Sequence, residues 1–206
     1  MAGLDSFRPG DLIDRGADIM VGMAALVLML PVMLATALAV RIALGSPVLF
    51  AQHRAGRRGR IFVIRKFRTM ADRRDSAGRL LPDGERTSRF GRWLRRSRLD
   101  ELPQLLNLVL GDMSLIGPRP LLPETIAGFG DAGIVRGMVR PGLTGWAQVH
   151  GNAALGDTDK LSLDIWYTGN RTRKRDLLIL LLTLRMILAG ERIDPRRLAE
   201  ARGARG

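Results

Sequence analysis

Two adjacent carboxylates, Asp100 and Glu101, stand in the stretch "SRLDELPQLLN" at residues 97–107, directly after a cluster of arginines. The apolar residues that follow recur at the spacing of one helix face: Leu102, Leu105, Leu106 and Val109. Gly111 is a typical stop signal. The pattern therefore predicts a helix whose positive N-terminal end carries both acids, a position that stabilises an ionised carboxylate and attracts phosphate.

Consecutive residues on a helix point about 100° apart, so these two acids are expected to do different jobs. One alternative needs no chemistry at all, since an Asp N-cap followed by a Glu in the first turn is common. The surroundings favour chemistry. Arg119 lies between two prolines in "GDMSLIGPRP", and Arg140 begins the Gly-rich "RPGLTGWAQV", which also contains Gln148.

Arginine forks suit phosphate oxygens, while an indole and an amide suit a base or a sugar. Mg²⁺ prefers one or two carboxylates together with substrate phosphates. The combination of acids and rigid Arg-Pro turns thus predicts a diphosphate site with Mg²⁺ as cofactor.

An uncharged run from Ile19 to Val40, "IMVGMAALVLMLPVMLATALAV", is long enough to place these residues at a membrane. As a straight helix it would cover roughly 33 Å, against about 30 Å for a bilayer core. Pro31 cannot donate a hydrogen bond to the carbonyl of Val27, so the helix should kink or break at Leu30-Pro31. A break predicts a re-entrant helix with both ends on the cytoplasmic face, which the flanking arginines also favour.

Two alternatives to the re-entrant helix stay open. A kinked helix could span the bilayer completely, because neighbouring groups often rescue transmembrane prolines. The run could also be a cleaved signal peptide, with small-residue sites at Ala35, Ala37 and Ala39. The dense positive charge that follows opposes translocation and counts against the signal peptide.

A second apolar stretch, "DLLILLLTLRMILAG" at residues 176–190, follows the basic "RTRKR" at 171–175. It is too short to span a bilayer. It predicts a helix lying in the headgroup plane and binding anionic membrane lipids, and a buried core helix is the alternative.

The middle of the chain predicts an α+β fold that is mostly helical. "PVLFAQH" and "RIFVIRK" indicate a short β-hairpin, and the polar residues 72–88 indicate a surface loop. We expect a re-entrant membrane anchor over residues 1–44, a catalytic domain with several interfacial amphipathic helices over 45–195, and a disordered tail over 196–206.

Composition narrows the possible chemistry. The 206 residues contain no cysteine, which excludes thiol nucleophiles, zinc-thiolate sites and disulfides. The formal net charge of +13 comes almost wholly from arginine and predicts a polyanionic partner. Nucleic acid, anionic lipid and a nucleoside diphosphate would all satisfy that charge.

The blocks "KFRTM", "LDELPQL", "GDMSLIGPRP" and "RPGLTGWAQV" in this order resemble the bacterial sugar transferase family, the monotopic phosphoglycosyl transferases. The resemblance runs from about residue 12 to residue 190 and matches the small form of the family. These enzymes are polyprenyl-phosphate glycosyl-1-phosphate transferases.

The resemblance implies a reaction and a set of roles. A sugar 1-phosphate would pass from a nucleoside diphosphate sugar, usually UDP-linked, through an aspartyl intermediate to polyprenyl (undecaprenyl) phosphate, with release of UMP. Asp100 would be the nucleophile and a Mg²⁺ ligand, and Glu101 would assist as base or partner. The further residues assigned to phosphate or substrate binding are Lys66, Arg119, Arg140, Gln148 and Asp164. The role of Asp164 is left open.

The same resemblance implies the first membrane step of glycan assembly, such as exopolysaccharide synthesis, at the cytoplasmic face of the bacterial inner membrane. Homo-oligomers are compatible with it. The dipeptide at Leu30 and Pro31 corresponds to the helix-breaking dipeptide of the family, although relatives often have Ser in place of Leu30. After "WAQV" relatives usually read "NGRN", whereas this chain has "HGNA", so His150 replaces Asn and an Arg is missing after Gly151.

Two other functions remain to be compared with this one. A nucleotide-sugar glycosyltransferase could use Asp157 and Asp159 as a metal-binding D-x-D motif. A membrane-tethered basic module could bind nucleic acid, but stacking aromatics are few and no reader motif is visible, so no specific nucleic-acid partner is expected. The sequence does not identify the sugar, the glycan pathway or the oligomeric state.

Overall fold

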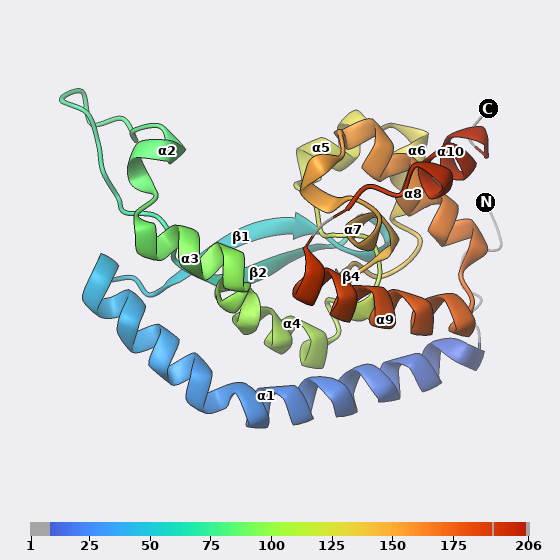
Figure 1. Ribbon diagram of the computed structural model, residues 1–206, viewed down its shortest axis with the longest axis horizontal. Helices are drawn as coiled ribbons and strands as arrows, with labels where there is room; N and C mark the ends of the chain where they lie inside the picture. The colour runs from blue at the N-terminus through green and yellow to red at the C-terminus, as the bar shows by residue number, and fades with distance from the viewer. Residues whose placement is uncertain (1–8, 191, 205–206) are drawn as a thin grey trace. The chain divides into compact units, whose positions relative to one another are not determined.

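The computed structural model describes residues 9–190 and 192–204. In this part of the chain most residues are helical, and the strands form two small two-stranded sheets (Figure 1). The predicted, mostly helical α+β class is confirmed. The chain forms two compact units. Unit 1 comprises residues up to 18, 53–62 and 110 onward, and unit 2 comprises 19–52 and 63–109.

The division into units differs from the expected division at residue 44. The long helix α1 and the hairpin each contribute to both units, because the first residues of α1 and the tip of the hairpin belong to unit 1. The elements up to α4 are α1 (Pro9–Leu44), β1 (Leu49–Ala55), η1 (Arg57–Gly59), β2 (Ile61–Phe67), α2 (Asp83–Arg86), α3 (Arg89–Ser97), η2 (Leu99–Gln104) and α4 (Leu105–Leu110).

Helix α1 is one continuous helix with Pro31 inside it. The helix is therefore not interrupted at Leu30-Pro31, where the sequence predicted a kink or a break. A proline removes one backbone hydrogen bond and crowds one carbonyl, and a bend can relieve both effects. Figure 1 shows α1 bending along its length and not folding back as two antiparallel arms.

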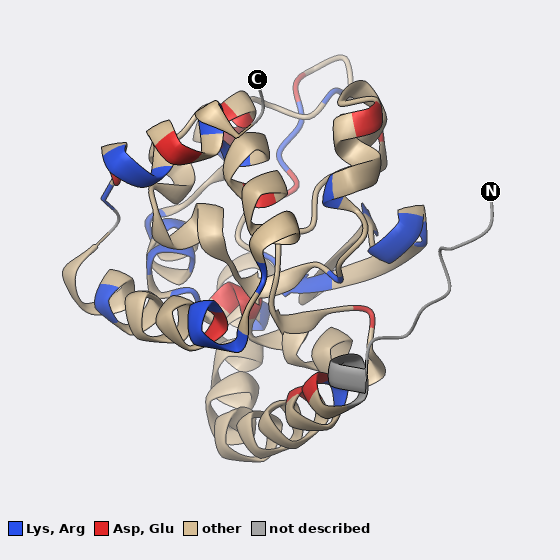
Figure 2. Ribbon diagram, turned by 90° about the vertical axis from the view of Figure 1, so that its right-hand side faces the viewer, with Lys and Arg blue, Asp and Glu red and all other residues tan. Residues whose placement is uncertain are grey.

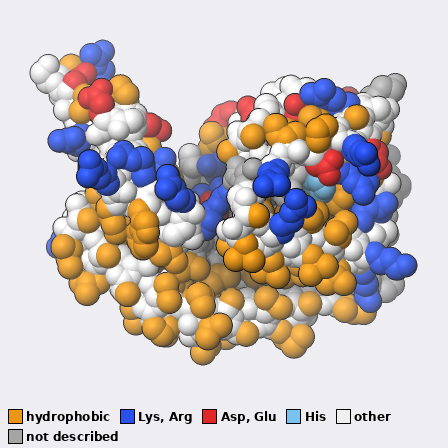
Figure 3. All heavy atoms as spheres, viewed as in Figure 1, with side chains coloured by type: hydrophobic (Ala, Val, Ile, Leu, Met, Phe, Trp, Pro, Cys, Tyr) orange, Lys and Arg blue, Asp and Glu red, His pale blue; other side chains and the backbone are white. Residues whose placement is uncertain are grey.

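The outer surface of α1 is apolar and exposed. In the described part of the chain one helix, Ile13–Leu44, is long and apolar enough to cross a membrane, and only 11% of its most apolar window is buried. A core helix of a soluble protein would be mostly buried. Figure 2 shows charged residues near the N-terminal end of α1 followed by an uncharged stretch, the last turn contains Arg41, and Figure 3 shows hydrophobic side chains gathered over the helix. These features indicate association with a membrane.

Unit 2 packs the second half of α1 onto the hairpin and α3. Val40, Phe67 and Leu94 form its buried core. The first half of α1 lies close to α4, because a Cβ added at Gly22 would come within 2.9 Å of the Val109 side chain. The predicted hairpin is confirmed as the antiparallel pair β1-β2. The predicted loop over residues 72–88 is confirmed as largely irregular, apart from the single turn of α2.

Unit 1 contains a short parallel sheet surrounded by helices. Its elements are β3 (Ser114–Ile116), α5 (Pro123–Gly128), α6 (Asp131–Arg136), β4 (Gly142–Thr144), α7 (Trp146–Val149), η3 (Asn152–Ala154), α8 (Asp157–Asn170), α9 (Arg173–Ala189) and α10 (Pro195–Gly203). Strands β3 and β4 pair in parallel, with Ser114 opposite Gly142. The core of unit 1 is aromatic, since the rings of Trp146 and Trp166 stack with centroids 5.1 Å apart.

Helix α9 corresponds to the second apolar stretch. Ile179 on one side of the helix is fully buried in the core of unit 1. The other side is exposed over its whole length, through Leu177, Leu181, Leu184 and Leu188. The alternative of a buried core helix is therefore wrong, because only one face of α9 is packed.

The C-terminal prediction needs a correction. Residues 196–206 were expected to form a disordered tail, but α10 extends through Gly203. Asp194 caps this helix by accepting hydrogen bonds from the amides of Arg196 and Arg197, and Ala201 is buried in the core of unit 1. The N-cap and the packing of Ala201 and Leu198 dock this short helix, which charge content alone does not reveal. The last two residues of the predicted tail lie outside the described part of the chain.

Candidate active site

The acid pair lies in unit 2, in a tight turn between two helices. Helix α3 ends at Arg98, which adopts a left-handed conformation with φ of 59°. The 3₁₀ turn η2 then carries Asp100 and Glu101, and α4 begins only at Leu105. The α-helix thus starts later than the leucine pattern predicts. The cause lies in Pro103, which disfavours the α conformation of the residue before it and leaves the first turn in the tighter 3₁₀ form.

Glu101 is held by two cations. Its Oε1 accepts a hydrogen bond from Nζ of Lys66 at 2.7 Å, and its Oε2 lies 3.5 Å from Nη1 of Arg98. Lys66 comes from β2, 35 residues earlier in the chain. The structure therefore brings Lys66 to the acid pair, but it does so through Glu101.

Asp100 differs from its neighbour in burial and in hydrogen bonding. Its side chain is buried, with the residue 7% exposed, and its Oδ1 has no hydrogen-bond partner among the described residues. Burial raises the pKa of the Asp100 carboxyl above its usual range, and the negative charge of Glu101 raises it further. The cations Lys66, Arg95 and Arg98 act in the opposite direction.

The unpartnered oxygen excludes the simple explanation of Asp100 as a helix cap. No side-chain hydrogen bond caps η2, whose N-cap position is Arg98. A buried carboxylate oxygen without a partner destabilises the fold, so it points to an external cationic or electrophilic group.

Helix α3 holds the arginines near this site by packing closely on the segment after β2. Gly91 approaches the backbone of Thr69 so closely that an added Cβ would lie 1.9 Å from the Thr69 carbonyl oxygen. Arg95, one helical turn further, donates a hydrogen bond from Nε to Oγ1 of Thr69 at 2.9 Å. The "KFRTM" block therefore supplies both Lys66 and the platform for α3.

The remaining predicted residues lie in unit 1. Arg119 is part of the loop after β3, and Arg140 directly precedes Pro141 and β4. Because β3 and β4 pair in parallel, the two Arg-Pro turns flank the same small sheet. Gly117 and Gly142 make this pairing possible, since a Cβ at Gly142 would lie 2.1 Å from the Gly117 nitrogen.

Asp164 is an interior residue. It is 2% exposed, and its Oδ2 accepts a hydrogen bond from Nε of Arg136 at 2.8 Å and forms an ion pair with Nη2 of the same residue, also at 2.8 Å. Burial raises the pKa of the Asp164 carboxyl, and Arg136 opposes this rise. Arg136 also donates from Nη2 to the carbonyl of Arg119 at 2.6 Å. Arg136 thus links Asp164 to the Arg119 loop, while Oδ1 of Asp164 is buried without a hydrogen-bond partner among the described residues. Assignment of Asp164 to substrate binding stays an untested prediction.

Gln148 and Trp146 are also buried. The amide of Gln148 donates to the carbonyl of Leu143 at 3.3 Å, and the indole of Trp146 stacks within the core. Contact of Gln148 with substrate stays an untested prediction. His150, the residue that departs from the family pattern, is 4% exposed and lies 4.1 Å from the Trp146 ring, and burial lowers its pKa.

Sequence reasoning missed Arg136, and it noted Arg95 only as one of the arginines that precede the acid pair. Arg136 had a usable signal, because a single arginine in the otherwise uncharged stretch from Ala132 to Val139 predicts a buried, paired cation. Arg95 had no signal that distinguished it from the other arginines of α3. Within its own unit, each set of predicted residues is brought together: Lys66, Asp100 and Glu101 in unit 2, and Arg119 and Asp164 in unit 1.

Comparison with known proteins agrees with these motifs. A family model described as bacterial sugar transferase matches residues 10–190. EpsL of Bacillus subtilis (strain 168), named an uncharacterized sugar transferase, is 47% identical over 163 residues, which cover 79% of this chain and 81% of EpsL.

Two relatives have more specific names. The UDP-N-acetylgalactosamine-undecaprenyl-phosphate N-acetylgalactosaminephosphotransferase of Aeromonas hydrophila is 42% identical over 187 residues, 86% of this chain but only 44% of that protein. The UDP-glucose:undecaprenyl-phosphate glucose-1-phosphate transferase of Caulobacter vibrioides is 37% identical over 209 residues, 89% of this chain and 75% of that protein. The chain thus spans less than half of the first and about three quarters of the second.

Proposed function

The chain belongs to the bacterial sugar transferase family, a family of polyprenyl-phosphate glycosyl-1-phosphate transferases, and on that premise we propose that it transfers a sugar 1-phosphate from a UDP-linked sugar to undecaprenyl phosphate. The observation that carries this proposal is the buried Asp100 carboxylate, which has one oxygen without a partner beside a Lys66–Glu101 ion pair. The relatives in Aeromonas hydrophila and Caulobacter vibrioides are named for sugar-phosphate transfer to undecaprenyl phosphate.

In the proposed first step, a carboxylate oxygen of Asp100 attacks the phosphorus that bears the sugar. The bond from this phosphorus to the bridging oxygen breaks, and UMP leaves with that oxygen. In the second step, an oxygen of undecaprenyl phosphate attacks the phosphorus of the aspartyl-phosphosugar. The carboxylate of Asp100 is released, and the sugar becomes linked to the lipid through a diphosphate.

The environment of Asp100 suits a nucleophile. A carboxylate attacking a charged diphosphate must overcome repulsion, and Lys66, Arg95 and Arg98 supply positive charge around it. Glu101 is already held by Lys66 and Arg98, so it is less available for attack. We therefore propose that Glu101 keeps these cations in place and that Asp100 forms the covalent intermediate.

The residues present also suit Mg²⁺. No group of three or more metal-ligating side chains lies together in the described part of the chain. Mg²⁺ in sites of this kind is commonly bound by one or two carboxylates and completed by substrate phosphates. The unpartnered Oδ1 of Asp100 is a suitable ligand atom. Bound Mg²⁺ would neutralise charge on the diphosphate.

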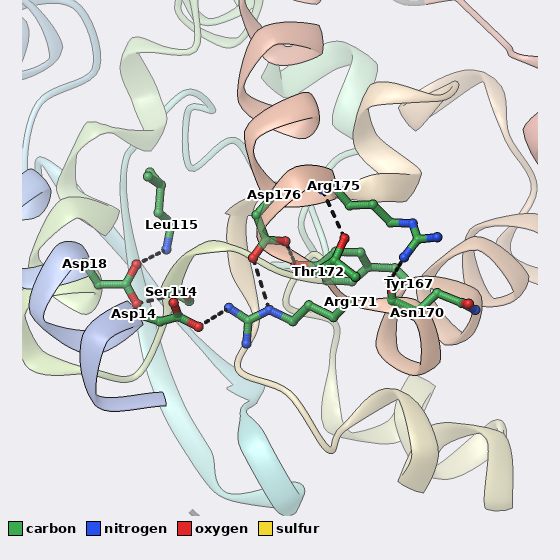
Figure 4. A network of polar contacts seen from close by, with 10 residues as sticks. All are labelled: Asp14, Asp18, Ser114, Leu115, Tyr167, Asn170, Arg171, Thr172, Arg175 and Asp176. Atoms are coloured by element: carbon green, nitrogen blue, oxygen red, sulfur yellow. Dashed lines mark hydrogen bonds and ion pairs between the residues drawn. The ribbon is translucent and has the colours of Figure 1, made fainter. Parts of the chain in front are cut away.

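We also propose that the enzyme is monotopic, with both ends of α1 on the cytoplasmic face of the inner membrane. Asp18 precedes the apolar run, is 5% exposed, and accepts hydrogen bonds from Oγ of Ser114 and the amide of Leu115, both at 2.8 Å (Figure 4). Asp14 forms an ion pair with Arg171 at 2.8 Å.

These contacts support the re-entrant arrangement because their partners follow the apolar run in the sequence. A helix that crossed the bilayer would separate Asp14 and Asp18 from residues 114, 115 and 171 by about 30 Å of hydrocarbon. A helix that enters and leaves on one face leaves the contacts intact. The exposed leucines of α9 form a separate apolar surface that suits binding to anionic headgroups.

No observation favours the two other functions. Asp159 is bound by Arg202, with Nη2 at 2.7 Å, and Asp157 lies 3.4 Å from Lys160, so both acids of the D-x-D motif already take part in ion pairs. They stand in the first turn of α8 and not at the end of a strand. Nucleic-acid binding still rests on net charge alone.

The test is a reconstituted reaction. Purified protein in lipid nanodiscs is incubated with Mg²⁺, undecaprenyl phosphate and a panel of radiolabelled UDP-sugars, and UMP and lipid-extractable label are measured. Equal amounts of UMP and labelled lipid are expected for at least one sugar. A reaction that contains undecaprenyl phosphate but no UDP-sugar gives the background. Turnover of Asp100→Asn at the wild-type rate would exclude Asp100 as the nucleophile.

A further inference from the structure

The loop that carries Arg119 can be held in place mainly through its carbonyl oxygens. In the sequence Gly117-Pro118-Arg119-Pro120-Leu121 both prolines lack a backbone N–H, so the usual donors are missing on either side of Arg119. The prolines fix their own φ angles, but the peptide planes between them need external partners.

Each of four consecutive carbonyls in this loop accepts a hydrogen bond. Two of the donors are backbone amides and two are arginine side chains. The pairs are Pro118 with the amide of Gly142 at 2.9 Å, Arg119 with Nη2 of Arg136 at 2.6 Å, Pro120 with Nη1 of Arg54 at 3.4 Å, and Leu121 with the amide of Ala55 at 3.0 Å. The bond to the Arg119 carbonyl is the shortest of the four.

Arg136 is itself fixed. It is 5% exposed, and the carboxylate of Asp164 binds its Nε and Nη2 at 2.8 Å. A buried ion pair adds little net stability compared with apolar side chains of the same size. What it does provide is a rigid, directional donor, because the planar guanidinium cannot turn without losing the carboxylate.

We propose that Arg136 is a positioning residue that acts through Arg119. Locked by Asp164, it fixes the peptide plane after Arg119 and thereby the direction in which the Arg119 side chain leaves the loop. This inference rests on the proposed function, in which Arg119 contacts the diphosphate of the donor. It assigns Asp164 the role of holding Arg136 and not of touching substrate.

The kinetic test is a double-mutant cycle between Arg136→Lys and Arg119→Ala. Lysine keeps the positive charge beside Asp164 but lacks the fork that serves Asp164 and the Arg119 carbonyl together. Arg136→Lys alone should lower kcat/KM for the UDP-sugar by about 10- to 100-fold, since a small misplacement of a binding group has effects of this order. In the Arg119→Ala background the same change should cause no further loss. Independent, multiplying losses would overturn the inference.

A second readout does not depend on activity. Hydrogen exchange of the peptide that contains residues 117–121 should become faster in Arg136→Lys than in the wild type. Arg202→Lys is the matched control, because Arg202 binds Asp159 of the same helix α8 through Nε and Nη2 and has no contact with the Arg119 loop. Unchanged exchange in Arg136→Lys, or an equal change in the control, contradicts the inference.

The two readouts separate the inference from the function on which it rests. If the wild type transfers none of the sugars tested, the proposed function fails, while exchange at residues 117–121 still decides whether Arg136 holds the loop. If Arg136→Lys does not fold, Asp164→Asn takes its place in both measurements. This variant keeps the guanidinium and removes the charge that locks it, and the same outcomes apply.

Discussion

At the level of single residues, the two adjacent acids differ because only one of them has found partners inside the protein. Glu101 receives Lys66 and Arg98, whereas Asp100 is buried with an unpartnered oxygen. A site that keeps a reactive group desolvated and unpaired gives up stability for reactivity. This trade can be measured on Asp100 itself.

Asp100→Asn is expected to abolish transfer and to stabilise the fold at neutral pH. Burial raises the pKa of Asp100, so the folded state holds this proton more tightly than the unfolded chain, and deprotonation above the raised pKa destabilises the folded state. Asparagine cannot be deprotonated. The free energy of unfolding should rise by about 1 kcal/mol, or about 2–4 °C in Tm for a chain of this size.

Thermal unfolding of the wild type and of Asp100→Asn at several pH values checks this prediction. The gain should be full above the raised pKa of Asp100 and should vanish below pH of about 4, where the carboxyl is protonated in both states. If the gain in unfolding free energy were independent of pH, the size or shape of asparagine, and not the loss of the carboxylate charge, would be its cause.

Lys66→Gln should shift the acidic limb of the plot of kcat/KM against pH to higher pH. Lys66 lowers the pKa of Asp100, and its loss leaves the charge of Glu101 less compensated, so both effects raise the pKa further. The ionised nucleophile would then appear only at a higher pH. Lys160→Gln, which removes a cation from unit 1 beside Asp157, is the control and should leave the limb in place. A limb that does not move in Lys66→Gln excludes Asp100 as the titrating group or Lys66 as its partner.

At the level of elements, the chain after β3 turns back at Gly117-Pro118 onto the start of β4, where the amide of Gly142 donates to the carbonyl of Pro118 at 2.9 Å, and glycine is required at the contact. A Cβ at Gly142 would lie 2.1 Å from the nitrogen and 2.7 Å from the Cα of Gly117. Backbone atoms cannot rotate away as a flexible side chain could, so the strands would have to separate.

Gly142→Ala is therefore expected to destabilise unit 1 by about 1–3 kcal/mol and to lower transfer activity as well. Gly169→Ala is the matched control: it lies in α8 with no atom within 4 Å of an added Cβ, and alanine in a helix should be neutral or stabilising by up to about 1 kcal/mol. Thermal unfolding of both variants is the measurement. Equal effects of the two changes would mean that the strand contact is looser than the structure shows.

At the level of the whole molecule, the route of α1 through the membrane decides on which side the two ends of the apolar run lie. The contacts of Asp14 and Asp18 with Arg171, Ser114 and Leu115 support a single side. The chain contains no cysteine, so single reporter cysteines can be introduced without background.

Asp5→Cys and Gly84→Cys, which precede and follow the apolar run, are expected to resist a membrane-impermeant maleimide in intact cells and to react after lysis. Both positions would then face the cytoplasm. Labelling of Asp5→Cys but not Gly84→Cys in intact cells would instead show that α1 crosses the bilayer, and it would exclude the monotopic arrangement.

The sequence by itself determined the family, the apolar helix, the hairpin and the acid pair at Asp100 and Glu101. These features depend on residues that lie close together in the chain: a continuous apolar run, alternating strands around a Gly-containing turn, and contiguous motif blocks. The turn after Arg98 was predicted at the right position, but as α-helix, whereas the structure has a 3₁₀ turn. The spacing of the leucines fits both an α-helix and a 3₁₀ turn that leads into one.

Only the tertiary structure decided what each polar group touches. Asp164 meets Arg136 across 28 residues, and Asp18 meets Ser114 across 96, and no local pattern encodes such partners. The same holds for α10, whose docking depends on the burial of Ala201. The physical reason is that the cost of burying a polar or charged group is set by the partner that folding brings to it, and that partner comes from a distant part of the chain.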